Sequence, residues 1–324
     1  MTQPAILRLG TRGSPLALAQ AYEVKRRLAE AHVDLADDAA VEIVVIVTTG
    51  DRIQDRALSE IGGKGLFTQE IEEALRDGSI DAAVHSMKDV PTWLPDGLEI
   101  STILPREDPR DAFFSLKCER LSELPRGAVV GSASLRRQAQ VLLLRPDLKV
   151  VTFRGNVQTR LRKLAEGEVD ATLLAVAGLR RLGEAERITS ILETDEMLPA
   201  VAQGAVGLEV RSDDVLTRGY LSAIDDAPSA VRVVAERACL EVLDGSCRTP
   251  IAALAELDQS PGQSPGQSHG ALTLRALVAM PDGSRVWRGT RQGSAGDAAA
   301  LGRDLGEQLR AEMGPEAIRS ITQH

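Results

Sequence analysis

The residues best placed to do chemistry are Lys88 and Asp89, which follow an apolar run that starts at Asp81. The run alternates small and apolar residues like a buried strand, and Pro91 disfavours a helical conformation at Val90. Lys88 and Asp89 are therefore expected where a strand opens into a loop, which is where α/β proteins place their chemistry. The alternative is a solvated ion pair worth about 0–1 kcal/mol, and these two residues alone do not decide between the two interpretations.

A second feature is a strongly basic segment in an acidic protein. The chain has a formal net charge of −9, yet residues 126–163 contain nine Lys or Arg and one acid, Asp147. Arg136 and Arg137 should open a helix, Arg154 should follow a strand and Arg160 should lie on the next helix. Guanidinium groups that converge from consecutive strand-to-helix turns bind carboxylates or phosphates in a fixed geometry. A solvated helix face is the alternative, and it suits Arg162 and Lys163 better than the turn positions. The segment therefore predicts an anionic ligand.

The N-terminal strand-to-helix turn is a candidate anion site of the same kind. A strand is expected over Ile6–Gly10, and Ser14 and Pro15 are typical cap and first residues of a helix that ends near Ala31. The turn between them presents backbone N–H groups, a hydroxyl and the Arg12 guanidinium. An ordinary capped helix with an exposed Arg12 explains these residues equally well.

The pattern of strands and helices predicts an α/β protein in three parts. Lobe 1 is expected over residues 1–104 and 204–222, lobe 2 over 105–203, and a small α+β domain over 223–324. Further strands are expected in lobe 1 at 41–47, as a buried strand, and at 98–104, and in lobe 2 at 128–131, 149–153 and 170–174, with helices at 68–76, 135–144 and 157–165. The third part should contain helices at 227–243 and 297–313 and strands at 251–257, 271–280 and 285–291. Residues 105–111 should be the hinge between the lobes, because they are polar and flanked by prolines.

Composition narrows the function. An aromatic content of 2% argues against a nucleic-acid stacking surface. The chain shows neither an export signal nor a membrane span, so a cytoplasmic protein is expected. The three cysteines have no metal-ligand spacing, so no metal site is expected. Cys247 lies beside Arg248, whose charge favours the thiolate form, although a structural role is the commoner one for a cysteine. A cysteine hydrolase would also need a histidine base, and His85 is the only histidine near other candidate residues, so that function is poorly supported.

Six motifs together resemble the porphobilinogen deaminase family, also called hydroxymethylbilane synthase. They are His85-Ser-Met-Lys-Asp-Val-Pro91, Gly62-Gly-Lys-Gly-Leu-Phe67, Ser134-Leu-Arg-Arg137, Arg154-Gly-Asn156 with Thr159-Arg160, Ala175-Val-Ala-Gly-Leu-Arg180, and Gly245-Ser-Cys247 with Pro250. The resemblance runs in order along essentially the whole chain. It implies two lobes like those of periplasmic binding proteins with a central cleft, plus a small α+β domain.

The resemblance also implies an activity and a set of residues. The family consists of transferases of tetrapyrrole biosynthesis, which leads to porphyrins and heme. They join porphobilinogen units head to tail, with loss of ammonia, on a dipyrromethane cofactor. By position, Cys247 would carry that cofactor through a thioether, Asp89 would be catalytic, and Lys64 would lie on a mobile lid. The remaining residues would bind carboxylates of the cofactor (Lys88, Ser134, Arg136, Arg137, Arg154, Arg160) or contact the substrate and growing oligopyrrole (Arg12, Ser14, Lys64, Phe67, Arg181, Gln203).

A two-lobed protein that binds an anionic metabolite without converting it is the alternative. The missing export signal and Cys247 argue against it. A monomer that binds neither nucleic acid nor membrane is expected. Two departures from the family pattern are small: Ser132-Ala133-Ser134 replaces a common Thr-Ser-Ser, and Ala202-Gln203-Gly204 replaces a common Gly-Gln-Gly.

Overall fold

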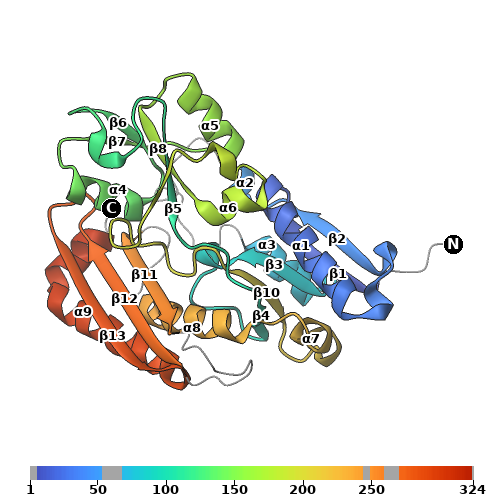
Figure 1. Ribbon diagram of the computed structural model, residues 1–324. Helices are drawn as coiled ribbons and strands as arrows, with labels where there is room; N and C mark the ends of the chain where they lie inside the picture. The colour runs from blue at the N-terminus through green and yellow to red at the C-terminus, as the bar shows by residue number, and fades with distance from the viewer. Residues whose placement is uncertain (1–5, 53–67, 244–248, 259–269, 323–324) are drawn as a thin grey trace. The chain divides into compact units, whose positions relative to one another are not determined.

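The computed structural model describes residues 6–52, 68–243, 249–258 and 270–322 of the 324-residue chain. The predicted Lys64, Phe67 and Cys247 lie outside the described residues. Contacts divide the described chain into two compact units, one made of residues 6–52, 68–107 and 205–230, and the other of the remaining residues. Elements are labelled in Figure 1. No helix in the described part is both long and apolar enough to cross a membrane.

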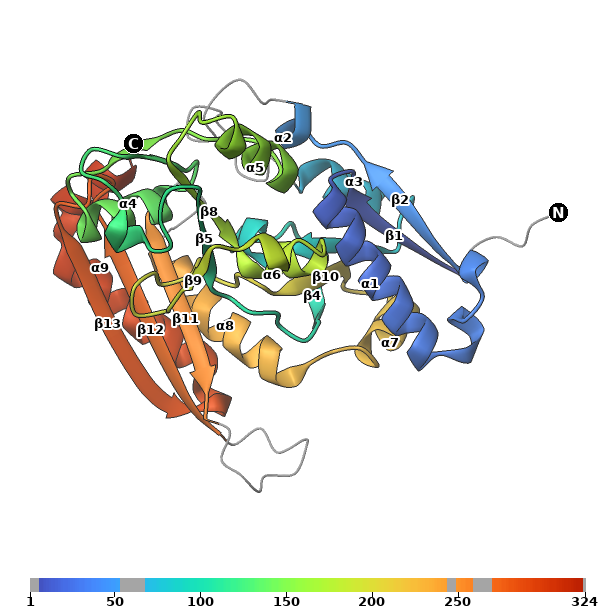
Figure 2. The same cartoon turned by 45° about the horizontal axis from the view of Figure 1, so that its top comes forward.

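The first unit is built on a five-stranded sheet with helices on both faces (Figure 2). Its strand order is β2 (Val41–Ile46), β1 (Leu7–Arg12), β3 (Ala82–Ser86), β10 (Val206–Arg211) and β4 (Leu98–Ile103), and β10 runs antiparallel to both neighbours. The helices are α1 (Pro15–Ala31), α2 (Thr49–Arg52), α3 (Gln69–Arg76) and α7 (Val215–Ser222). One core lies between the sheet and α1, and a second between the sheet and α3.

The second unit repeats this design around its own five-stranded sheet. The order is β7 (Lys149–Val151), β6 (Val129–Gly131), β8 (Ala171–Ala175), β5 (Asp111–Ser115) and β9 (Ser190–Leu192), with helices α4 (Leu135–Leu144), α5 (Val157–Ala165) and α6 (Val176–Arg181). In both sheets the fourth strand is antiparallel to its neighbours. Both also place a serine cap before the helix that follows the first parallel strand, Ser14 for α1 and Ser134 for α4. The prediction of two α/β lobes of similar design is thus confirmed.

A smaller antiparallel sheet forms the third part and packs on the second lobe. It contains β11 (Ile251–Leu257), β12 (Ala271–Ala279) and β13 (Val286–Ser294). Ala139 of α4 shares a core with Leu254 and Leu277 of this sheet, and Gln138 Nε2 donates to Pro281 O at 3.2 Å. The sheet therefore braces the helix that carries the basic Arg-Arg pair.

Most predicted elements agree with the structure, and the differences have physical causes. The helices expected at 135–144 and 157–165 are confirmed as α4 and α5. The strand expected to be buried at 41–47 is β2, but it is the outermost strand of its sheet, so that prediction was wrong and Val45 is 51% exposed. Strand β5 begins at Asp111, which had been assigned to the hinge.

The segment that joins the second lobe to β10 has an unusual backbone at Ala202. Its φ of 56° lies in the left-handed region, which glycine occupies more easily than alanine. Glu236 of α8 (Ala227–Val242) is fully buried and accepts hydrogen bonds from Ala202 N at 2.6 Å and Ala255 N at 2.8 Å. This carboxylate therefore ties the segment to strand β11.

Helix α8 packs closely against α9 (Ala298–Thr322), which Figure 1 shows alongside the third sheet. A Cβ atom at Gly302 of α9 would lie 2.2 Å from Ala235 O and 2.8 Å from Ala238 Cβ. The contact is therefore possible only because position 302 has no side chain. Helix α9 is interrupted at Gly314, just after the predicted end at 313.

Gly302→Val should lower the free energy of unfolding by about 1–3 kcal/mol, because the added side chain forces α8 and α9 apart. Urea unfolding followed by far-UV circular dichroism would measure the change. Gly219→Ala on α7 is the matched control, since no atom lies within 4 Å of a Cβ placed there. That substitution should leave stability equal or slightly higher. An unchanged midpoint for Gly302→Val would contradict the close packing of the two helices.

Candidate active site

Asp89 lies on a short 3₁₀ turn, Met87–Asp89, directly after β3. Val90 has the extended conformation that the following Pro91 requires. Met87 N donates to Ala205 O at 3.0 Å, which fixes the turn to the start of β10. The predicted position of Asp89, where a strand opens into a loop, is confirmed, and no described residue forms a hydrogen bond or ion pair with its side chain.

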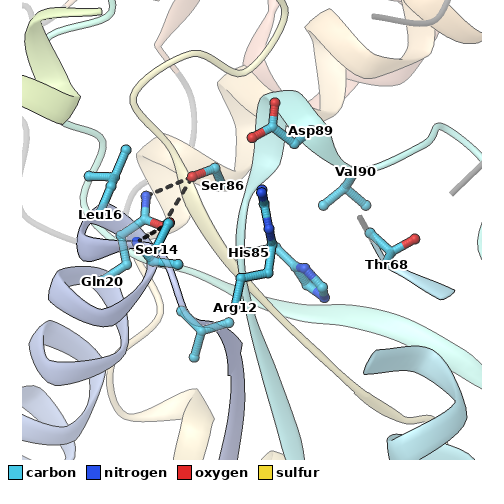
Figure 3. Close-up of a pocket in the computed structure, with 11 residues that line it drawn as sticks. Arg12, Ser14, Leu16, Gln20, Thr68, His85, Ser86, Asp89 and Val90 are labelled. Atoms are coloured by element: carbon cyan, nitrogen blue, oxygen red, sulfur yellow. Dashed lines mark hydrogen bonds between the residues drawn. The ribbon is translucent and has the colours of Figure 1, made fainter. Parts of the chain in front are cut away.

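Asp89 lines a cavity of the first unit with about 440 Å³ of empty space, part of it open to solvent (Figure 3). Arg12 and Ser14 line the same cavity, so residues predicted from two separate motifs lie together, whereas Lys88 is on the turn but not in the lining. The other polar lining residues are Gln20, Thr68, His85 and Ser86.

Two hydrogen-bonded pairs support the floor of this cavity on opposite sides of β3. On the α1 side, Gln20 Nε2 donates to Ser86 Oγ at 2.8 Å. On the α3 side, His85 Nε2 and Glu209 Oε2 share a buried hydrogen bond of 2.9 Å. Figure 3 shows Ser86 with Gln20 on one side of the strand and the His85 ring on the side of Thr68. The His85–Glu209 pair is buried and the Gln20–Ser86 pair is partly buried, and together they hold the end of β3, and with it Asp89, in place.

The second unit contains a buried ion cluster at the start of α4. Ser134 Oγ caps this helix by accepting a hydrogen bond from Arg137 N. Arg136 and Arg137, which had been predicted to bind the cofactor, are nearly fully buried, and both donate to the carboxylate of Asp111, at 2.7 Å in each case. The two guanidinium groups hold the pKa of Asp111 well below its usual range despite the burial of that carboxyl.

Beside Arg137 lie cations that no described acid balances. Burial, as the largest cause, and the positive charges of Arg137 and Arg154 together lower the pKa of Arg160 to about 10. Arg154 Nη1 is buried without a hydrogen-bond partner in the described part of the chain. Clustered guanidinium groups with an unused buried donor fit a multiply charged carboxylate ligand, because its oxygens would supply the missing acceptors.

Two predicted substrate residues lie near the segment that follows the second lobe. Both terminal nitrogens of Arg181 donate to Gly204 O at 3.2 Å. Gln203 is buried, and its Nε2 donates to Pro109 O at 2.6 Å and to Asp111 Oδ1 at 2.9 Å. Their predicted contact with substrate stays a prediction, whereas their contacts with this segment are part of the fold.

Sequence reasoning missed the roles of Asp111, Gln20 and Glu209, although Gln20 and Glu209 each left a signal. Gln20 lies four residues before Val24 and eight before Leu28, so it is a polar residue in the buried stripe of α1. Glu209 is a lone acid within the apolar strand β10. Both patterns indicate a buried polar group that needs a partner.

The described cysteines differ in accessibility. Burial raises the pKa of the Cys239 thiol to about 12, so this group is a thiol rather than a thiolate at neutral pH and a poor nucleophile. Cys118 is half-buried near Ser115 and Arg120. No group of three or more potential metal ligands is found among the described residues.

Comparisons with known proteins cover nearly the whole chain. Residues 7–218 match the family model "Porphobilinogen deaminase, dipyromethane cofactor binding domain", and residues 230–311 match "Porphobilinogen deaminase, C-terminal domain". The chloroplastic porphobilinogen deaminase of Oryza sativa is 56% identical, covering 98% of this chain and 87% of the rice protein. The Paracoccus denitrificans porphobilinogen deaminase is 59% identical, covering 94% of this chain and 93% of that protein.

The chain belongs to the porphobilinogen deaminase family. It is therefore a transferase of porphyrin and heme biosynthesis that condenses porphobilinogen into hydroxymethylbilane on a dipyrromethane cofactor, as the resemblance predicted. Membership also decides against the alternative of a simple binding protein.

Among solved structures, an ABC-transporter periplasmic substrate-binding protein from Coxiella burnetii aligns with a TM-score of 0.42 and 18% identity, covering 71% of this chain and 96% of that one.

The clustered guanidinium groups of Arg137, Arg154 and Arg160 should bind simple anions when the cofactor is absent. In a Cys247→Ser background, sodium sulfate should raise the melting temperature by about 2–4 °C relative to sodium chloride of equal ionic strength, since ligand binding to the native state stabilises it. Adding Arg160→Met should remove most of this shift. Adding Arg162→Met, on the same helix but paired with Glu166, should leave it intact. Equal shifts in both variants would contradict an anion site at Arg160.

Proposed function

We propose that Asp89 carries out the proton transfers of the condensation and stabilises the cationic pyrrole. Loss of ammonia from porphobilinogen leaves an electron-poor methylene-pyrrole cation. A carboxylate beside it stabilises the positive charge. The free α-carbon of the terminal pyrrole attacks the methylene carbon of the cation, and once the new carbon–carbon bond has formed the carboxylate accepts the proton that this α-carbon releases. The observation that carries the assignment is that Asp89 lines the cavity without a described ion-pair partner. A paired carboxylate would be less available as a base.

The surrounding residues are proposed to bind the acidic side chains of the substrate. Arg12 ends β1, Ser14 caps α1, and both line the cavity. Each porphobilinogen carries acetate and propionate groups, so these donors match its charge. Lys64 and Phe67 remain predicted substrate contacts of the lid, and Arg181, Gln203 and Lys88 remain predicted contacts of the oligopyrrole or cofactor.

The cofactor is proposed to be attached to Cys247 and held by the second unit. When bound, dipyrromethane supplies the free pyrrole α-carbon from which the chain grows. Ser134 and the arginines of the cluster, Arg136, Arg137, Arg154 and Arg160, would bind its carboxylates. The high pKa of Cys239 supports Cys247 over Cys239 as the attachment site.

The chain is further proposed to act as a cytoplasmic monomer that binds neither nucleic acid nor membrane. Relatives named as chloroplastic show that family members also work in an organelle, so cell fractionation is the test of compartment. Sedimentation equilibrium of the purified protein would establish the oligomeric state.

Intact-mass measurement tests the attachment of the cofactor. The purified protein should exceed its sequence mass by one dipyrromethane unit, because the thioether survives purification. Cys247→Ser should abolish the excess, and the matched Cys118→Ser and Cys239→Ser variants should keep it. An unmodified protein that is fully active on porphobilinogen would refute the covalent cofactor on this chain.

Replacing the proposed acid–base group should stop turnover without removing the cofactor. Asp89→Asn is expected to lower kcat by about 2–4 orders of magnitude, the scale of general acid–base catalysis, while retaining the dipyrromethane mass. Asp96→Asn, at an exposed position seven residues further along the chain, is the control and should have normal turnover. Near-normal kcat in Asp89→Asn would exclude the proposed role.

A further inference from the structure

Asp111 is the centre of a fully buried ionic cluster in the second unit. Its Oδ1 accepts from Arg137 Nε at 3.2 Å, from Arg137 Nη2 at 2.7 Å and from Gln203 Nε2 at 2.9 Å. Its Oδ2 accepts from Arg136 Nη1 at 2.7 Å. The carboxylate has no exposed surface. Four donors from three side chains therefore fix the position of one acid.

The same hydrogen bonds fix both arginines. Arg137 Nη1 donates to Leu173 O at 2.9 Å, and Arg136 Nη1 donates to Leu198 O at 2.8 Å, so each guanidinium is held by Asp111 and by one backbone carbonyl. A planar guanidinium held at two points cannot rotate freely. Asp111 thus determines the orientation of both groups.

The charges in this cluster do not balance. Two buried arginines share one acid, and the surplus positive charge of Arg137 acts on Arg160, next to Arg154 with its unused Nη1. Stability alone does not require such an arrangement, because well-packed apolar residues in place of a buried ion cluster are often at least as stable. An excess of fixed positive charge is instead what a site for a polycarboxylate needs.

We propose that Asp111 is a positioning residue for cofactor loading, which orients Arg136 and Arg137 so that the anion site at Arg154 and Arg160 accepts the carboxylates of dipyrromethane. This inference rests on the proposed role of these arginines. Asp111 would not itself contact a bound anion, because both of its carboxylate oxygens already accept hydrogen bonds from arginine or amide donors. It acts through the arginines and does not contact the cofactor.

Gln203 connects the cluster of Asp111, Arg136 and Arg137 to the segment before β10. Its Nε2 bridges Asp111 Oδ1 and Pro109 O, so the amide joins the start of β5 to the Ala202–Gly204 segment. A displacement of that segment would therefore pull on the carboxylate that orients the arginines. Gln203 is in this view a second support of the anion site.

The test is the fraction of purified full-length protein that carries the cofactor, measured by intact mass before and after incubation with porphobilinogen. Asp111→Asn keeps the shape but removes the charge, and it should lower the loaded fraction at least tenfold while the far-UV circular dichroism spectrum stays native. Asp108→Asn is the matched control: Asp108 lies three residues away and pairs with Arg110 and Arg180, and its variant should load normally.

Asp111→Glu separates position from charge, because it keeps the carboxylate but moves it by one methylene. Partial loading, between those of the wild type and Asp111→Asn, supports positioning. If Asp111→Asn does not fold, the Glu variant decides: loading below half of wild type supports the proposal, and full loading overturns it. Full loading of a folded Asp111→Asn also overturns it. If the wild-type protein itself lacks the dipyrromethane mass, the proposed cofactor attachment fails instead, so the two failures are distinguishable.

Discussion

The burial of two guanidinium groups around a single carboxylate constrains the second unit more than any other interaction. Taking charges out of water is costly unless each finds a partner, and Asp111 is the only acid that faces Arg136 and Arg137 among the described residues. Meeting that requirement positions the start of β5, the first turn of α4 and the segment at Gln203. Neighbouring Arg154 and Arg160 then remain as cations without an acidic partner among the described residues.

The first unit differs in having a carboxylate, that of Asp89, which no described cation pairs with. This carboxylate lies on the turn at the end of β3, and a separate hydrogen-bonded polar pair lies on each side of the strand. The two units thus share a strand order, but the first places an acid, Asp89, together with Arg12 in its cavity, whereas the second gathers arginines. An acid for proton transfer and cations for carboxylates are the two requirements of a reaction that condenses acidic pyrroles.

The sequence predicted features that depend on neighbouring residues. The caps at Ser14 and Ser134, helices α4 and α5 and the position of Asp89 all follow from local pattern, and the structure agrees with them. The sequence did not predict contacts between residues that are far apart in the chain, such as Asp111 with Arg136 and Gln203 or His85 with Glu209. The exposure of β2 was missed for the same reason, because strand order is a property of the whole sheet.

Ala202 shows that the segment before β10 holds a backbone conformation that its own residue type disfavours. A φ of 56° costs alanine about 1–2 kcal/mol, which exceeds the about 0.4–1 kcal/mol by which alanine restricts the unfolded chain more than glycine. The conformation must therefore be held by its surroundings, and the hydrogen bond from Ala202 N to the buried Glu236 carboxylate is one such contact. The segment is in this sense a small store of backbone strain within the fold.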